Sequence, residues 1–280
     1  APRRGFALAV GVLLVSLSLV FAAWLQARAQ QRKAAEAEFV GHTGEVIEQL
    51  RQRLLKYELV ARGGASLFAT VSRPTPRQWR DYVVGMSIGQ RFPGLAGLGF
   101  AGYIPGPRLV DLQLEWRQAG YGQLDVRPHG IRADYGPILY LEPRTMENVA
   151  AIGYDMYADP ARRAAMVVAM ETGEARLTGR TRLVQDRSGE RSGLLMYLPV
   201  YAGGGVPGQP AQRRAQAQGW VYLPFYADDF VAAALGETNP GLRFRIVDVT
   251  GGGATPLAEH GPRLPEGETP AFVHHAPLDA

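Results

Sequence analysis

The most uniform hydrophobic stretch of the chain lies at residues 6–25, which contain no charged residue and only two serines. A run of about twenty apolar residues can cross a hydrocarbon core of about 30 Å as a helix. A cleaved signal peptide is the alternative, because Arg3 and Arg4 precede the run and Phe21-Ala22-Ala23 is rich in small residues. The run is longer than the apolar region of a usual signal peptide, and Trp24 stands where an interfacial anchor belongs. We therefore predict a retained membrane helix at 6–25.

A helical pattern continues over residues 26–71, where apolar residues recur at spacings of three and four. The recurring positions are Val40, Thr43, Ile47, Leu50, Leu54, Tyr57 and Ala61. This stripe predicts a stalk helix with two possible roles: the seam of a parallel homodimer, or a face that packs on its own domain. Gly41 and Gly44 weaken a long coiled coil. From Leu54 onward the stripe must also cover the core of the domain that follows.

Beyond residue 71 the pattern alternates between short helices and short strands. The predicted elements are a helix at 77–88, a strand at 95–103, a helical portion around 109–119, strands at 220–225 and 243–249, a short helix at 228–235 and a hairpin partner at 271–275. Residues 203–219 are rich in Gly, Pro, Gln and Arg and show no hydrophobic period, which predicts a loop.

The clearest helix signals lie between residues 136 and 201. Asp159 is a good N-cap, Pro160 suits the first helical position, and Gly173 suits the left-handed residue that ends a helix. Residues 175–185 and 194–201 are rich in Leu, Val, Tyr and Thr and flank a polar turn. The segment therefore predicts a strand, a loop, a capped helix of about three turns, and an antiparallel hairpin.

Several short motifs in this region and around it occur together in one order. They are Ile138-Leu139-Tyr140-Leu141-Glu142-Pro143, Asn148, Gly153-Tyr154-Asp155, Pro160-Ala161-Arg162-Arg163, Glu171-Thr172-Gly173, Leu177-Thr178, Leu183-Val184-Gln185 and Tyr197-Leu198-Pro199-Val200-Tyr201, with Phe92-Pro93-Gly94-Leu95 and Leu98-Gly99-Phe100 before them and Gly219-Trp220-Val221-Tyr222-Leu223-Pro224-Phe225 after them. In this order and spacing they resemble the CHASE domain. This domain is an extracytoplasmic sensor module of receptor histidine kinases and diguanylate cyclases, known also from plant cytokinin receptors.

The resemblance implies an α+β fold with an N-terminal transmembrane helix, a long stalk helix and two stacked PAS-like α/β lobes with antiparallel sheets. The implied division is a cytoplasmic N-terminus at 1–5, the membrane helix at 6–25, the stalk at 26–71, a ligand-binding distal lobe at 72–202 and an incomplete membrane-proximal lobe at 203–280. Lysine and arginine lie on both sides of the span, so its orientation in the cytoplasmic membrane, with the sensor region outside, rests on the resemblance. The implied output, a histidine kinase or diguanylate cyclase, is not part of this chain.

The helix that begins after Asp159 carries Arg162 and Arg163 in its first turn, where the helix dipole disfavours cations. An anion must compensate for these charges. One candidate is a salt bridge to Asp155, Asp159 or Glu142. The other is an anionic ligand held jointly by a guanidinium group and the amides of the helix N-terminus.

The resemblance also points to individual pocket residues. Cytokinin-receptor relatives carry an acid at the position of Arg162, so we expect this chain to reject cytokinins and to prefer an anionic ligand. By the same matching, Met156, Thr178, Val184 and Tyr197 fall on positions that line or support the pocket. These mostly apolar side chains with one or two hydroxyl groups suit a small organic ligand.

Motifs for catalysis are present but lack the required context. Gly85-Met86-Ser87-Ile88-Gly89 fits the G-x-S-x-G motif of hydrolases, which needs a strand before the serine, whereas the pattern predicts a helix there. It leaves a membrane-tethered periplasmic hydrolase as an alternative function. Two G-x-G-x-x-G matches, at 97–102 and 203–208, fall in a predicted strand and a predicted loop, so we expect no nucleotide site.

The histidines, the carboxylates and the net charge exclude further classes of function. His274 and His275 are adjacent on a predicted strand, so they point to opposite faces, and the other histidines lack ligand-like spacing. Glu142, Glu147, Asp155 and Asp159 have no accompanying catalytic group, which favours structural roles. A formal charge of +4, spread along the chain, predicts no nucleic-acid partner. We expect no catalytic residue, metal or cofactor; a partner-binding ectodomain without a small ligand is the third alternative.

Overall fold

The computed structural model describes residues 2–186, 189–236, 242–250, 252–262, 270 and 272–277. Its helices are α1 (Pro2–Thr70), α2 (Pro76–Met86), α3 (Ile88–Arg91), α4 (Leu109–Gln118), α5 (Met146–Ala151), α6 (Pro160–Thr172), α7 (Pro210–Gln216) and α8 (Ala227–Leu235). Its strands are β1 (Leu98–Gly102), β2 (Ile104–Pro105), β3 (Asp134–Tyr135), β4 (Ile138–Glu142), β5 (Arg176–Leu177), β6 (Gly193–Tyr201), β7 (Ala217–Tyr226), β8 (Phe244–Asp248) and β9 (Thr255–His260). The fold is α+β with antiparallel sheets, as predicted.

Helix α1 is one helix of 69 residues, so the predicted membrane helix and the predicted stalk form a single element. By length and composition it could cross a membrane. The large apolar side chains that it carries between Val12 and Leu25 are exposed, as those of a lipid-facing helix are.

The chain divides into two compact units. One consists of Ala1–Glu48 with Leu264–Pro277, and in it the ring of Phe39 stacks on that of Phe272 at 5.7 Å. The other consists of Gln49–Arg263 with Leu278–Ala280 and contains the sheets. The candidate site lies wholly in this second unit.

A five-stranded antiparallel sheet with the order β4-β1-β7-β6-β5 organises the second unit. Strand β7 lies at its centre, where Tyr222 is opposite Gly99 of β1 on one side and Tyr197 of β6 on the other. The predicted lobe boundary after residue 202 falls between β6 and β7, two strands that pair along their length. A Gly- and Pro-rich connection between β6 and β7 resembled a linker in sequence, although it joins neighbours in one sheet.

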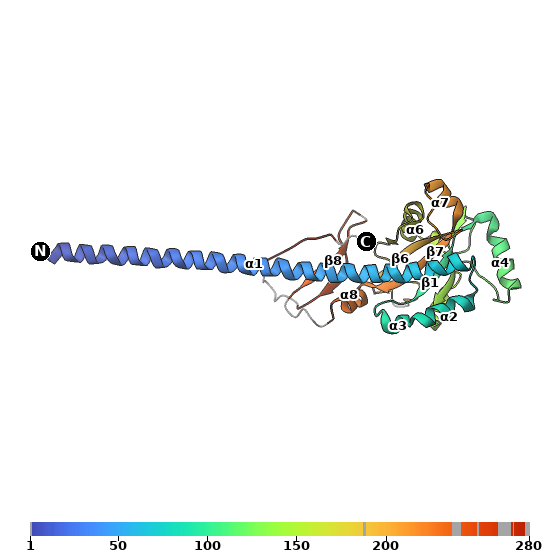
Figure 1. Ribbon diagram of the computed structural model, residues 1–280, viewed down its shortest axis with the longest axis horizontal. Coiled ribbons are helices and arrows are strands. Elements are labelled where there is room, and N and C mark those ends of the chain that lie inside the picture. The colour runs from blue at the N-terminus through green and yellow to red at the C-terminus, as the bar shows by residue number, and fades with distance from the viewer. Residues whose placement is uncertain are drawn as a thin grey trace. The chain divides into compact units, whose positions relative to one another are not determined.

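One face of this sheet is covered by α2 and the C-terminal part of α1, which Figure 1 shows running along β1, β6 and β7. The ring of Phe68 in α1 lies 4.2 Å from that of Phe100, and the ring of Trp79 in α2 stacks on that of Tyr140 at 5.8 Å. Burying an aromatic side chain of this size stabilises the fold by about 1.5 to 3 kcal/mol.

This packing decides the role of the apolar stripe on the stalk helix from Leu50 onward. Leu50, Leu54, Tyr57 and Ala61 are buried within the second unit, so they pack on their own domain and do not form a dimer seam. Leu55 and Leu59, on the opposite side of the helix, are 51% and 67% exposed.

Helix α6 covers the other face of the sheet. The indole Nε1 of Trp220 donates a 2.9 Å hydrogen bond to the carbonyl of Met166, and the hydroxyl of Tyr201 donates a 2.6 Å bond to the carbonyl of Met170. The predicted caps are confirmed: Asp159 accepts from the first-turn amides, and Gly173 ends the helix with a φ of 80°. These bonds fix α6 over strands β6 and β7.

Other elements differ from the sequence-based expectation. The helix predicted at 77–88 corresponds to α2, which ends at Ser87 with a φ of 54°, and the short helix α3 that follows was not predicted. Short helices α5 and α7 occupy segments predicted as loops. Strand β5 spans only two residues of the predicted strand at 175–185, although it pairs antiparallel with β6 as expected.

Of the second predicted lobe, 203–280, strand β7 belongs to the five-stranded sheet and α7 leads into it, and the rest of its described part consists of α8 and the two-stranded ribbon of β8 and β9. Strand β8 matches the strand predicted at 243–249, but its partner is Thr255–His260 and not residues 271–275. Residues 272–275 form no regular structure, and Ala271 lies outside the described residues.

Candidate functional site

Arg162 is buried at the start of α6, with 3% of its surface exposed. The carboxylate Oδ1 of Asp159 accepts hydrogen bonds from the amides of Ala161 and Arg162 at 2.9 and 3.0 Å, so it caps the helix. The guanidinium Nη2 of Arg162 donates a 2.5 Å hydrogen bond to the carbonyl of Arg182, whereas its Nε has no hydrogen-bond partner among the described residues. A buried, incompletely paired cation thus lies under the first turn of the helix.

Of the three carboxylates that could pair with Arg162, only Asp159 lies within ion-pair distance among the described residues, at 4.0 Å from Nε. Asp155 instead accepts from the amides of Gly136 and Tyr157 at 2.7 and 3.0 Å. Its Oδ2 lies 3.4 Å from Arg132 Nη1. Burial raises the pKa of Asp155, and these hydrogen bonds only partly oppose the rise. Glu142 pairs with Arg80 at 3.3 Å.

Aromatic side chains surround the Arg162 guanidinium. Its carbon lies 5.0 Å from the ring centroid of Tyr154, within the range of a cation–π interaction. The rings of Tyr197 and Tyr222 lie 6.2 Å apart on the sheet surface below it. Burial raises the pKa of both phenols, and the nearby Arg162 charge partly opposes this, so both hydroxyl groups are protonated donors at neutral pH.

The two tyrosines differ in their hydrogen bonds. The hydroxyl of Tyr197 lies 3.0 Å from the sulfur of Met156 and donates to it, and both residues are fully buried. The hydroxyl of Tyr222 is buried and has no hydrogen-bond partner in the part of the chain that the structure describes. Gly99 makes room for this ring, because a Cβ at position 99 would overlap it. Arg162 Nε and Tyr222 Oη are thus two unpaired donors on the same side of the sheet.

The other two predicted residues lie near this cluster but differ in role. Thr178 is buried, and its Oγ1 accepts a 3.1 Å hydrogen bond from the amide of Leu195, which extends the pairing of β5 with β6. Val184 is partly buried and packs on the core cluster that includes Met156 and Tyr197. The structure therefore brings Arg162, Met156, Tyr197 and Val184 into one region, with Thr178 directly after strand β5.

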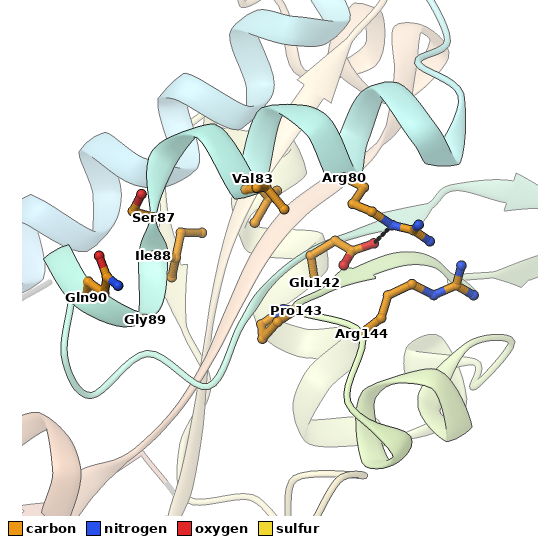
Figure 2. A pocket seen from close by; sticks show the side chains of 10 residues that line it. Arg80, Val83, Ser87, Ile88, Gly89, Gln90, Glu142, Pro143 and Arg144 are labelled. Carbon is orange, nitrogen blue, oxygen red and sulfur yellow. Dashed lines mark hydrogen bonds and ion pairs between the residues drawn. The ribbon is translucent and has the colours of Figure 1, made fainter.

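Two cavities lie elsewhere in the second unit, and none of the five predicted residues lines either of them. One, of about 490 Å³, runs beside β4 and the end of α4, with Trp116, Tyr121 and Tyr140 in its wall. The other, of about 530 Å³, lies between α2, α3 and the segment after β4, as Figure 2 shows.

Ser87, the serine of the G-x-S-x-G match, lines the second of these cavities. It follows the last turn of α2 and precedes α3, so the strand that a hydrolase nucleophile requires before the serine is not there. Within the described residues, no three His, Asp or Glu side chains gather as metal ligands would.

The family model of the CHASE domain matches residues 72–258, about two thirds of the chain. The chain belongs to the CHASE domain family. No curated protein matches it. Among solved structures, one similar chain is the ligand-binding domain of the Pseudomonas aeruginosa PAO1 amino acid chemoreceptor PctC in complex with GABA. It is 16% identical, with a TM-score of 0.41, and the alignment covers 75% of this chain and 70% of that one. Values this low do not establish a shared fold.

Within this CHASE domain, the matching of motifs did not assign Tyr154, Tyr222 or the carbonyl of Arg182 to the pocket, although all three lie near Arg162. Tyr222 could have been found from strand alternation, because it lies two residues from Trp220 and so on the same face of β7. The carbonyl of Arg182 gives no signal in sequence.

Proposed function

We propose that this CHASE domain and its N-terminal helix form the extracytoplasmic sensor region of a receptor in the cytoplasmic membrane. Its output is a histidine kinase or a diguanylate cyclase on the cytoplasmic side. The family match supports the sensor role. The exposed apolar side chains between Val12 and Leu25 support the membrane anchor.

The ligand we propose is a small organic anion that binds at Arg162. The observation that carries this proposal is the buried guanidinium group, with its unpaired Nε, close to the unpaired hydroxyl of Tyr222. Buried donors without partners are costly. A carboxylate or phosphate oxygen would accept from both groups and would also neutralise the cation.

The rest of the cluster supplies the features of a small-molecule site. Met156, Val184 and the rings of Tyr154 and Tyr197 offer apolar surface, and Thr178 supports the adjoining strand. Ligand pockets commonly combine an apolar wall with a few polar groups that fix orientation. The ligand gains access when the contact of Arg162 with the Arg182 carbonyl is exchanged for one with the anion.

This exchange also supplies a route for the signal. The segment released by Arg162 includes Arg180, whose amide donates a 2.7 Å hydrogen bond to Asp248 of β8. An anion that withdraws Arg162 from Arg182 thereby alters a segment tied to the β8–β9 ribbon. Only a ligand that binds one of these two arrangements better than the other can shift the receptor between them.

We further propose that the receptor is a homodimer through the exposed side of α1. Leu55 and Leu59 are the large apolar residues of the second unit's α1 segment that stay open to solvent among the described residues. They lie one turn apart, so they present a single apolar strip.

The ligand proposal is tested with the whole chain in lipid nanodiscs. Small carboxylates and phosphate esters are screened by thermal shift, with adenine-type cytokinins as the comparison class, because a bound ligand raises the melting temperature. Hits are then titrated calorimetrically against Arg162→Ala and Arg162→Lys. Loss of a charge-assisted contact costs about 1.5 to 3 kcal/mol, or roughly ten- to a hundredfold in affinity.

Arg163→Ala is the matched control, because Arg163 is an exposed arginine in the same helical turn. Its affinity should equal that of the wild type. If both Arg162 variants also retain full affinity, Arg162 is only a structural partner of Asp159 and Arg182, and the anion site is wrong. If no member of the library binds, the chain acts as a partner-binding ectodomain.

A further inference from the structure

The cavity of about 530 Å³ in Figure 2 is formed by two segments far apart in sequence. Arg80, Val83 and Val84 of α2 make one wall, followed by Ser87 and α3, and Glu142, Pro143 and Arg144 make the opposite wall. Its volume lies in the usual range for small-molecule sites, about 300 to 1,000 Å³. This cavity is separate from the Arg162 cluster, which lies on the α6 side of the sheet.

The middle of the cavity is apolar. Val83 and Ile88 each expose only 4% of their surface, whereas Val84 exposes 67% and so offers its side chain to an incoming molecule. Gly89 adds no obstruction, because a Cβ at this position would meet nothing within 4 Å. An apolar group bound here would lose its water contacts at little cost in rearrangement.

The charges of the cavity do not balance. Arg80 Nε pairs with Glu142 Oε1 at 3.3 Å, and Glu142 exposes only 6% of its surface. Arg144 also lines the cavity and forms no ion pair within the described part of the chain. Figure 2 shows the guanidinium groups of Arg80 and Arg144 toward one end, with Glu142 beside Arg80. Glu142 therefore neutralises Arg80 alone, and the charge of Arg144 is left for a ligand.

Ser87 gives the cavity its shape. Its φ of 54° makes it the one residue other than glycine with a positive φ among the residues described. This left-handed conformation ends α2 and turns Ile88 and Gln90 of α3 toward the cavity. Residues held in such sparsely populated conformations cluster at ligand sites. The Ser87 hydroxyl makes no side-chain hydrogen bond at the α3 terminus.

We propose that this cavity binds a second small molecule, an organic carboxylate with a compact apolar body. The carboxylate lies between Arg144 and Arg80, where guanidinium groups offer paired donors. The apolar body lies against Val83, Val84 and Ile88, and Ser87 and Gln90 supply polar contacts at the far end. This inference does not depend on ligand binding at Arg162.

The probe is 4-phenylbutyrate, titrated calorimetrically into the whole chain in nanodiscs, with 4-phenylbutyramide as its uncharged counterpart. Arg144→Gln removes the unpaired cation from an exposed position, and Val84→Glu places a negative charge on the apolar wall without disturbing the core. Arg77→Gln is the control, because Arg77 lies on the same helix with its side chain 91% exposed and outside the cavity.

Wild type and Arg77→Gln should bind 4-phenylbutyrate equally, Arg144→Gln about tenfold more weakly, and Val84→Glu not detectably. Arg162→Ala should leave this binding unchanged, which separates the two sites. The proposal is overturned if the wild type does not bind the probe, if the amide binds as well as the acid, or if Arg162→Ala abolishes binding while Arg144→Gln retains it. The last result would assign the carboxylate to the Arg162 cluster.

Discussion

The backbone amide of Arg180 donates a 2.7 Å hydrogen bond to Oδ2 of Asp248. This bond joins the segment after β5 to strand β8. The same carboxylate accepts from the amide and the hydroxyl of Thr250 at 2.9 and 2.6 Å. Burial favours the neutral acid, but the hydrogen bonds outweigh it and hold the pKa of Asp248 below its ordinary value. Asp248 therefore stabilises this junction as a carboxylate.

We predict that Asp248→Ala lowers the free energy of unfolding by about 1 to 2 kcal/mol at pH 7, because it removes the acceptor of these bonds. Since the folded pKa is lowered, this stabilisation is present above the unfolded pKa of about 3.9 and is lost as pH falls through the folded value. Urea unfolding of both proteins between pH 7 and acid should show the difference shrink. A stability difference that stays constant with pH would contradict this role of the Asp248 carboxylate. Asp81→Ala is the control, because Asp81 belongs to an exposed i,i+4 ion pair.

Tyr222→Phe should separate a binding role from a structural one. The Tyr222 hydroxyl is buried and has no partner among the residues described, so its removal should leave the ligand-free protein equally stable or stabilise it by up to about 1 kcal/mol. Affinity for an anionic ligand should fall, because a donor is lost. Tyr197→Phe is the comparison, since its hydroxyl already bonds to Met156. Unchanged affinity in Tyr222→Phe would exclude this hydroxyl from the ligand site.

The N-terminal part of α1 should behave as a retained membrane anchor. After expression of the chain, the protein should stay in the membrane pellet through a carbonate wash and keep its original N-terminus, as read by mass spectrometry. Leu14→Arg is the control, because a charge at the centre of a span opposes insertion by about 2.5 to 3.5 kcal/mol. Recovery of a soluble form that begins near Trp24 would mean that residues 6–25 are a cleaved signal peptide.

Single cysteines along α1 can test the homodimer. Cysteine at Leu55 or Leu59 should form a disulfide between two copies in the membrane, because both positions are exposed. Cysteine at Leu54 or Tyr57 should not, because these positions are buried against the protomer's own sheet. Cysteine at Val40 tests whether the contact continues toward the membrane. Equal crosslinking at Leu54 and Leu55 would contradict a dimer along this side of the helix.

Local signals in the sequence predicted local structure well. Helix α6 was predicted because Asp159, Pro160 and Gly173 each act within their own turn, and the structure confirms all three. Helix α4 coincides with the helical portion predicted around 109–119. Helix α7 was missed, because it has no apolar period and is held by tertiary contacts: Arg213 donates to the carbonyls of Glu171 and Pro207.

Where a distant segment decides the backbone path, sequence reasoning failed. Strand β5 ends after Leu177, and Gly179 then passes so close to β8 that a Cβ there would lie 2.5 Å from Asp248 Oδ2. Strand β9 was missed because it contains Pro256, which argues against a strand. The ribbon tolerates this proline opposite Val247, beside a shift in register.

In the candidate site too, local features could be predicted from the sequence and long-range contacts could not. The position of Arg162 in the first turn of α6 could be predicted from the sequence, and so could Asp159 as one candidate for its salt-bridge partner. The identity of its neighbours could not, because Tyr222, Arg182 and Arg162 come together only when β7 and the segment before β6 pack on α6. The pocket residues Met156, Thr178, Val184 and Tyr197 remain a prediction that ligand binding must test.

Strand β7 is the last strand of the five-stranded sheet to leave the ribosome, although it lies at the centre. Strands β1 and β6 are not hydrogen-bonded to each other, so neither completes its pairing until β7 has been synthesised. Long-range pairing of this kind slows folding and exposes unpaired edges in the meantime. Nascent chains that stop before residue 217 should therefore be targets for chaperones and proteases, and shortened versions of the domain should be designed to extend beyond residue 226.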